Sequence, residues 1–275
     1  MPVKSRGGFD TYSAQLGQGA RKALLIHCSL AHSGSWAGLM GALGDTLSAE
    51  AFDLPGHGRS GDWVGDVDFQ DQALAMAADF MAEEPIDLIG HSFGGTVALR
   101  LALEQPDRVR SLTLIEPVLF AAARGTPEYA ENEALFAPFA EAIARGDRVA
   151  ASKAFTGPWG AGAPWEALPR QLQDYIERRI HLIPAGNAAL MDDRPGVLAP
   201  DRLEGLDIPV LLLEGGSSPS IVGAVNAALA ARLARARRAT IPGAGHMLPI
   251  THPKQVAHAI EGFLADASAP AISPG

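Results

Sequence analysis

The pentapeptide Gly90-His91-Ser92-Phe93-Gly94 has the pattern G-x-S-x-G, in which a serine stands close to two glycines. It follows the apolar run 86–89 and precedes a segment, 96–104, with the composition of a helix. A serine at a sharp strand-to-helix turn projects its hydroxyl, and the glycines relieve the crowding that such a turn creates. The amide end of the following helix favours negative charge that develops there. This context predicts that Ser92 is a catalytic nucleophile.

A serine hydroxyl attacks only when a base takes its proton, and His246 is our candidate for that base. It lies in a glycine-rich stretch, 243–249, between the last predicted strand and the last predicted helix. Loops at the carboxyl ends of parallel strands form the ligand crevice of open sheets, so a base there can reach Ser92. We interpret the following residues as surface, packing or turn histidines: His57, His181, His252 and His258. The histidines lack metal-ligand spacing, so no metal site is expected.

The chain resembles the alpha/beta-hydrolase family in four features, which occur in the order typical of that family. They are a loop around His27 after an early strand, the run 53–60 (Asp-Leu-Pro-Gly-His-Gly-Arg-Ser), the turn 90–94 and the late Gly245-His246. The resemblance covers nearly the whole chain. It implies a mainly parallel sheet flanked by helices, with a helical cap inserted into it.

The loop around His27 departs from the family pattern. The family usually has His-Gly there, whereas this chain has His27-Cys28. The resemblance implies an oxyanion hole made by the backbone N–H groups of Phe93 and, in this loop, Ser29. Because main-chain donors do not depend on side-chain identity, Cys28 does not abolish the hole. We interpret Cys28 as a small buried filler that narrows the site.

The acid of the triad is the second departure. After the strand that ends near Glu214 the family usually places an aspartate in the pattern G-x-x-D, but Ser218 occupies that position here. Loss of the triad carboxylate costs about 10⁴ in rate, because a hydroxyl cannot stabilise a charged imidazole. Some relatives, haloalkane dehalogenases among them, carry the acid after the strand that follows the elbow helix, which corresponds to Glu116. We expect Glu116 to be the acid of the triad. Glu214 is the second candidate, and a site without any acid is the third possibility.

The type of nucleophile distinguishes between reactions of the family. Relatives that open epoxides or displace halide use an aspartate, so Ser92 disfavours both reactions. A serine with a histidine base suits hydrolysis of an ester, thioester, lactone or amide, or of a C–C bond beside a ketone. We expect cleavage of small carboxylic esters through an acyl-enzyme. The alternatives are a C–C bond hydrolase of aromatic ring-cleavage products and a ligand-binding member that hydrolyses slowly or not at all.

Composition limits the partners. The chain has 275 residues, of which 47% are hydrophobic and 19% charged, and its formal charge of −9 disfavours nucleic acid and anionic membranes. The single cysteine excludes an internal disulfide and fits a reducing compartment. No secretion signal or membrane span is recognisable. We expect a cytoplasmic protein that acts on a small-molecule substrate without a cofactor. The residues after Asp266 are expected to form a disordered tail. The sequence does not predict the oligomeric state.

Short apolar runs alternate with helical segments, which is typical of an α/β fold with a mainly parallel sheet. Strands are predicted at 23–27, 49–53, 86–89, 109–115, 208–214 and 238–241. Helices are predicted from about 35 and at 68–84, 96–104, 222–236 and 253–265. The alternation stops in the proline-rich segment 118–205, where helical pieces at 131–145 and 169–180 occur without a convincing strand. We therefore expect a hydrolase core of residues 1–117 and 206–275 and a helical cap of residues 118–205.

Aromatic residues can form an apolar wall around the nucleophile, as in many small-molecule sites. Packing within the cap core is the alternative for each of them. The candidate pocket residues are Trp36, Phe120, Phe136, Phe139, Trp159 and Trp165.

Overall fold

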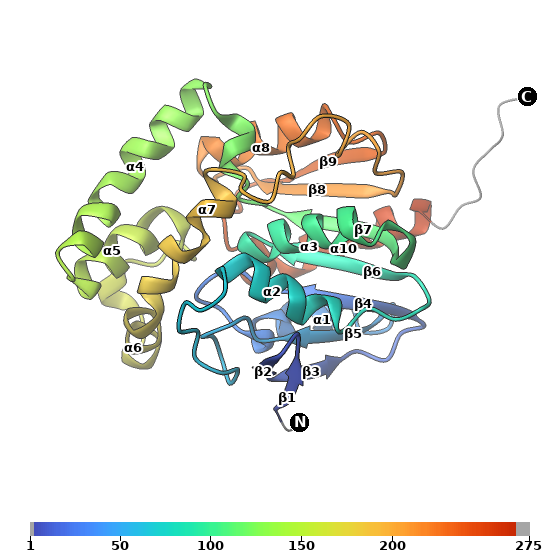
Figure 1. Cartoon of the computed structure of the whole chain (residues 1–275), viewed down its shortest axis with the longest axis horizontal. Helices are drawn as coiled ribbons and strands as arrows, with labels where there is room; N and C mark the ends of the chain where they lie inside the picture. The colour runs from blue at the N-terminus through green and yellow to red at the C-terminus, as the bar shows by residue number, and fades with distance from the viewer. Residues whose placement is uncertain (1–2, 268–275) are drawn as a thin grey trace, which may run out of the picture.

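The computed structural model describes residues 3–267, and a seven-stranded sheet forms its centre (Figure 1). The strand order is β3-β5-β4-β6-β7-β8-β9; β3 runs antiparallel to β5, and the other neighbouring pairs are parallel. Strands β1 and β2 form a separate antiparallel pair. The strand bounds are β1 Lys4–Arg6, β2 Phe9–Thr11, β3 Ser13–Leu16, β4 Arg21–Ile26, β5 Leu47–Phe52, β6 Ile86–His91, β7 Val109–Ile115, β8 Val210–Gly215 and β9 Ala236–Ile241. The predicted α/β fold is confirmed.

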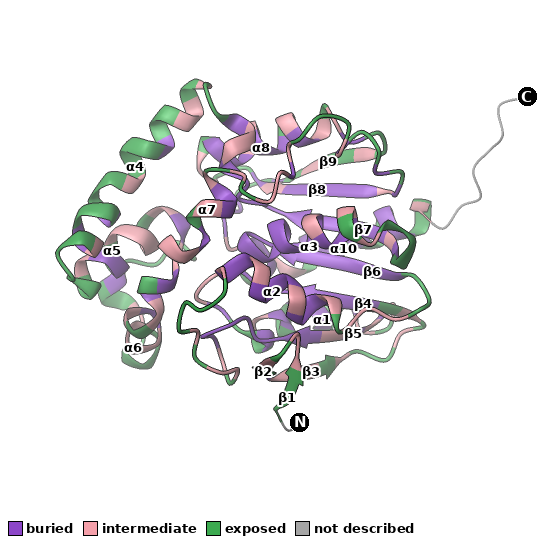
Figure 2. Cartoon of the chain, viewed as in Figure 1, coloured by how far each residue is buried: buried purple, intermediate pink, exposed green. Residues whose placement is uncertain are grey.

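Helices cover both faces of the sheet, which explains why its central strands are apolar throughout. Neighbouring residues of one strand point to opposite faces: Leu24 belongs to the apolar core that includes α2, α3 and α8, whereas Leu25 belongs to the core that includes α1 and α10. Figure 2 shows the central strands buried along most of their length. The helix bounds are α1 Ala37–Leu43, α2 Phe69–Ala78, α3 Phe93–Glu104, α8 Ser220–Ala230, α9 Leu248–Thr251 and α10 Pro253–Ala267.

The segment between β7 and β8, which the structure describes throughout, contributes no strand to the sheet. Its helices lie beside the sheet at the left of Figure 1, and their outer faces are exposed in Figure 2. They share a small apolar core formed by Phe139, Ala142, Ala151, Trp165, Ile176 and Ile180. The bounds are α4 Pro127–Ala144, α5 Arg148–Trp159, α6 Arg170–Arg179 and α7 Asn187–Leu190.

Several elements differ from the sequence prediction. Helix α2 ends at Ala78, before the acidic run that leads to Pro85, and α8 ends at Ala230, six positions before the predicted 236. Helix α5 was not predicted, and neither were β1, β2 and β3, whose short polar strands depend on pairing between segments. Most of the predicted tail after Asp266 lies outside the described residues. Within residues 3–267, no helix combines the length and the hydropathy that a bilayer span requires.

Candidate active site

Ser92 occupies the turn between β6 and α3 with φ 56° and ψ −120°, a backbone conformation that is rare for residues with a side chain. Such a residue stores about 1–3 kcal/mol of strain. The turn also brings backbones into close contact: a Cβ on Gly94 would lie 2.2 Å from the carbonyl oxygen of Ile26, and one on Gly90 would lie 2.4 Å from that of Gly94. The glycines of the motif are therefore required by packing, as the sequence predicted.

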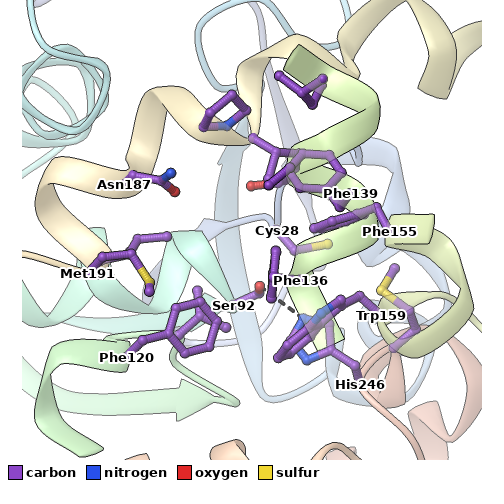
Figure 3. A pocket seen from close by; sticks show the side chains of 18 of the residues that line it. Cys28, Ser92, Phe120, Phe136, Phe139, Phe155, Trp159, Asn187, Met191 and His246 are labelled. Atoms are coloured by element: carbon purple, nitrogen blue, oxygen red, sulfur yellow. Dashed lines mark hydrogen bonds between the residues drawn. The ribbon is translucent and has the colours of Figure 1, made fainter. Parts of the chain in front are cut away.

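A hydrogen-bonded chain joins Ser92, His246 and Glu116, which come from the ends of β6, β9 and β7. The imidazole Nδ1–H donates to Oε2 of Glu116 at 2.6 Å. Its Nε2 faces Oγ of Ser92 at 2.9 Å and accepts from the hydroxyl (Figure 3). All three side chains are buried, with 7%, 4% and 0% exposure for Ser92, His246 and Glu116. This tautomer leaves Nε2 free to take the serine proton, which is the arrangement of a nucleophile, a base and an orienting carboxylate.

The Glu116 carboxylate is fixed on its far side. Its Oε1 accepts from the backbone N–H of Gly215 at 2.6 Å and from the hydroxyl of Ser218 at 2.5 Å. Ser218 therefore donates to Glu116, and Glu116 in turn contacts His246. Glu214, the alternative acid, instead binds Asn226 at 2.9 Å and Arg238 at 3.1 Å. Of the two carboxylates considered from the sequence, the structure brings only Glu116 to His246.

His91 connects the nucleophile turn to the loop that carries the base. Its Nε2 lies 2.8 Å from the carbonyl oxygen of His246. A carbonyl only accepts, so this nitrogen carries the proton. Burial lowers the pKa of His91 to about 3, which keeps the ring neutral. The residue before Ser92 thus fixes the main chain of the base.

Two backbone N–H groups, both in residues that adjoin Ser92 in sequence or line its cavity, donate to no acceptor within residues 3–267. One belongs to Phe93, the first residue of α3, and the other to Ser29, in the loop after β4. Ser29 and Ser92 line the same cavity. The sequence proposed these two amides as oxyanion donors, and in the structure both are available to an external oxygen.

Ser92 and His246 line a cavity of about 310 Å³ whose wall is mostly apolar (Figure 3). Four of the aromatic residues expected from the sequence line it: Phe120, Phe136, Phe139 and Trp159. The Trp159 ring meets the His246 imidazole edge-on, with 4.7 Å between centroids. Cys28 also lines the cavity, and burial raises the pKa of its thiol to about 12, so it is no thiolate nucleophile.

Trp36 and Trp165 do not line this cavity, contrary to expectation. Trp36 is 2% exposed and belongs to the apolar core that includes residues of α1 and α10. Trp165 packs in the small core of the inserted helices. Conversely, sequence reasoning missed Phe155, although it precedes Trp159 by four residues and so shares its helix face. Other lining residues that gave no signal are Ile183, Asn187, Leu190 and Met191.

The described residues contain no group of three or more His, Cys, Asp or Glu side chains that could hold a metal ion. His181 and His258 are exposed, and His252 is half-buried at the start of α10. The apolar wall of the cavity likewise offers no cluster of charged side chains for a phosphate-bearing cofactor.

Three buried histidines predict acid sensitivity. Burial lowers the pKa of His27, His57 and His91 from 6.5 to about 3. The unfolded chain therefore binds more protons than the folded one between these values, so stability is complete above pH 6.5 and falls toward pH 3. Each histidine contributes a slope of about 1.4 kcal/mol per pH unit. Urea unfolding between pH 7 and pH 4 measures this slope, which His57→Gln should reduce and the exposed control His258→Gln should not. Equal slopes in the two variants would contradict the assignment.

Comparison with known proteins identifies the family of this chain. Residues 23–259 match the model of the family described as the alpha/beta hydrolase family. Over 247 residues the chain is 30% identical to the pimeloyl-[acyl-carrier protein] methyl ester esterase of Xanthomonas campestris pv. campestris, and the match covers 88% of this chain and 94% of that protein. A 119-residue stretch is 37% identical to the dihydrolipoyllysine-residue acetyltransferase component of the acetoin cleaving system of Cupriavidus necator. That match covers 42% of this chain and 32% of the other protein.

The solved structures show the same fold. The enol-lactonase from Burkholderia xenovorans superimposes with a TM-score of 0.72 at 21% identity, covering 96% of this chain and 100% of the other. The family model spans most of the chain and agrees with the sheet order and the helix layers described above. The chain therefore belongs to the alpha/beta hydrolase family.

Proposed function

We propose that this alpha/beta hydrolase cleaves small, uncharged carboxylic esters through an acyl-enzyme on Ser92. The observation that carries the proposal is the hydrogen-bonded chain from Ser92 through His246 to Glu116 at the end of an apolar cavity. Similarity to a methyl ester esterase supports the reaction class. The preference for uncharged esters follows from the side chains that line the cavity.

The reaction follows from the geometry. Nε2 of His246 takes the hydroxyl proton while Oγ of Ser92 attacks the ester carbonyl. The N–H groups of Phe93 and Ser29 stabilise the oxyanion. His246 then returns the proton to the leaving alcohol, and the C–O bond to the alcohol breaks. Water, activated by the same imidazole, releases the acid and restores Ser92. Glu116 stabilises the imidazolium in both halves.

We assign residues 118–205 as the cap over this site. Helices α4 and α5 supply Phe136, Phe139, Phe155 and Trp159 to the cavity wall. A second cavity, of about 410 Å³, lies between α5, α6 and the loop after β4. It shares four lining residues with the first: Ser29, Phe155, Trp159 and Met247. The first cavity contains Ser92 and suits the acyl part, and the second has room for the alcohol.

The charge of the side chains that line the first cavity determines which substrates fit it. Among the described residues that line the first cavity there is no Asp, Glu, Lys or Arg. A buried carboxylate without a partner costs several kcal/mol, so an acyl group that ends in a carboxylate is disfavoured. The cost of burying an unpaired charge also disfavours the anionic products of aromatic ring cleavage.

A pair of p-nitrophenyl esters tests this preference. The neutral hexanoate should be hydrolysed with a kcat/KM at least about 10²-fold above that of the hemiadipate, which has the same six carbons and a terminal carboxylate. Equal values for the two esters, measured at constant ionic strength, would contradict an uncharged acyl site.

Labelling with a fluorophosphonate tests the reaction class without knowledge of the substrate, because this reagent forms a bond only with an activated serine. We expect stoichiometric labelling of the wild-type chain, located at Ser92 by peptide mass spectrometry. A chain that is folded but neither labelled nor active on a panel of esters would refute the proposed function.

A further inference from the structure

The loop that carries the Ser29 amide is held by hydrogen bonds on both sides of this residue. Residues 28–31 form a turn closed by the Ala31 N–H, which donates to the carbonyl of Cys28 at 3.2 Å. Leu30 adopts φ 61°, a conformation that a residue with a branched side chain rarely adopts without support. Beyond the turn, the N–H of Ser33 donates to Asp53 at 2.6 Å. Ser29 occupies the centre of a turn whose shape depends on its neighbours.

His57 supports the strained residue of this turn. Its Nε2 accepts from the N–H of Leu30 at 3.0 Å, and its Nδ1–H donates to the carbonyl of Pro55 at 2.8 Å. The ring is 0% exposed, and burial lowers its pKa to about 3, so it stays in the neutral form that can accept. His57, which the sequence indicated only as a histidine that orders a turn, therefore supports the turn that carries Ser29.

Tyr175 reaches the same loop from helix α6. Its hydroxyl donates to the carbonyl of Ala31 at 2.7 Å and accepts from the N–H of Gly58 at 3.0 Å. One hydroxyl thus joins three segments: the cap, the loop after β4 and the run 53–60. The guanidinium of Arg179 lies 3.9 Å from the Tyr175 ring centroid and donates to the carbonyl of Gly56 at 2.9 Å, which fixes the ring in place.

The side chain of Leu30 adds a packing contact to these hydrogen bonds. It is half-buried against the small apolar core of the inserted helices, which includes Phe139 and Ile176. The turn that presents the Ser29 amide therefore contacts the cap through Leu30 and through Tyr175. Movement of α6 relative to the sheet would change the direction of that amide.

We propose that His57 and Tyr175 are positioning residues that aim the Ser29 N–H at the oxyanion, so that cap helix α6 sets the strength of transition-state stabilisation. The inference rests on the proposed ester hydrolysis and on Ser29 as an oxyanion donor. An oxyanion donor is useful only when it is fixed before the charge develops, and loss of one donor costs about 10²–10³ in kcat. An N–H donor that is still present but points away from the oxyanion should lower kcat by less than complete removal of the donor does.

Tyr175→Phe tests the inference with the smallest change, since it removes one hydroxyl and keeps the ring on Arg179. We expect kcat for a p-nitrophenyl ester to fall by about 10–10² with KM changed less than about twofold. The inhibition constant of an alkyl trifluoromethyl ketone, whose adduct with Ser92 places an oxyanion in the hole, should rise by the same factor. Tyr129→Phe removes the corresponding hydroxyl from cap helix α4 and is the matched control; within residues 3–267 no hydrogen bond joins Tyr129 to the 28–33 loop.

A pair of variants at His57 provides an independent test. Gln can place an acceptor near the position of Nε2, whereas Leu cannot, so His57→Gln should keep several-fold more kcat than His57→Leu. Inhibitor affinity should follow kcat in both variants. If His57→Leu does not fold, Tyr175→Phe alone decides.

The outcomes separate this inference from the proposed function. An active wild type with an unchanged kcat in Tyr175→Phe, or with a raised KM alone, would overturn the positioning role and leave ester hydrolysis standing. A wild type that reacts with neither ester nor fluorophosphonate would overturn both.

Discussion

Ser92→Ala is expected to abolish ester hydrolysis and fluorophosphonate labelling while the fold is retained. Removal of the nucleophile of a triad lowers turnover by about 10⁶, because the remaining groups only bind and polarise the substrate. The turn itself should tolerate the change, because the positive φ costs alanine about as much as it costs serine. The hydrogen bond of 2.8 Å from the N–H of residue 92 to the carbonyl of Ile115 is also kept.

Initial rates with a neutral p-nitrophenyl ester measure this effect, and thermal unfolding checks the fold. Ser48→Ala, on β5 and away from the cavity, removes a hydroxyl elsewhere and is the matched control. A Ser92→Ala variant that keeps more than about a thousandth of the wild-type rate would indicate another nucleophile.

Glu116→Gln should lower turnover by about 10²–10⁴ with little change in KM. The substitution keeps the size of the side chain but removes the charge that stabilises the imidazolium, and an amide can also stabilise the wrong tautomer of His246. The Oε2 that lies 2.6 Å from Nδ1 of His246 carries this effect. Because the charge matters most when the imidazolium forms, the loss should appear in kcat.

Variants at Ser218 and Glu214 show whether the loss of turnover is specific to the Glu116 carboxylate. Ser218→Ala removes one hydrogen bond to Glu116 and should cost at most about 10–10²-fold, since a bond to a charged group contributes about 1.5–3 kcal/mol and the Gly215 N–H remains. Ser218→Asp should partly restore activity to Glu116→Gln, because it returns a carboxylate to the place that the family usually uses. If Glu116→Gln keeps most of its turnover while Glu214→Gln loses it, the acid is assigned to the wrong residue.

The sequence by itself determined the parts of this protein that depend on local physics. Alternating apolar and helical segments predicted the α/β fold, because strands buried on both faces must be apolar throughout. The glycines of the 90–94 turn were recognisable because close backbone approach excludes every other residue, as the 2.2 Å from a Cβ on Gly94 to Ile26 O illustrates. Ser92 and His246 could be selected because their chemistry requires the ends of parallel strands.

Contacts between distant segments were decided only by the tertiary structure. Glu116 and Glu214 both follow parallel strands, and the sequence could favour one only by resemblance; the fold separates them, because the Glu116 backbone turns at φ 47° and directs its carboxylate to His246. Trp36 illustrates the opposite case, since an aromatic residue fits a cavity wall or a core equally well until packing is known. The Tyr175 hydroxyl reaches Ala31 across 144 positions in sequence. No local pattern specifies such a contact, because it exists only where the inserted helices and the sheet are packed together.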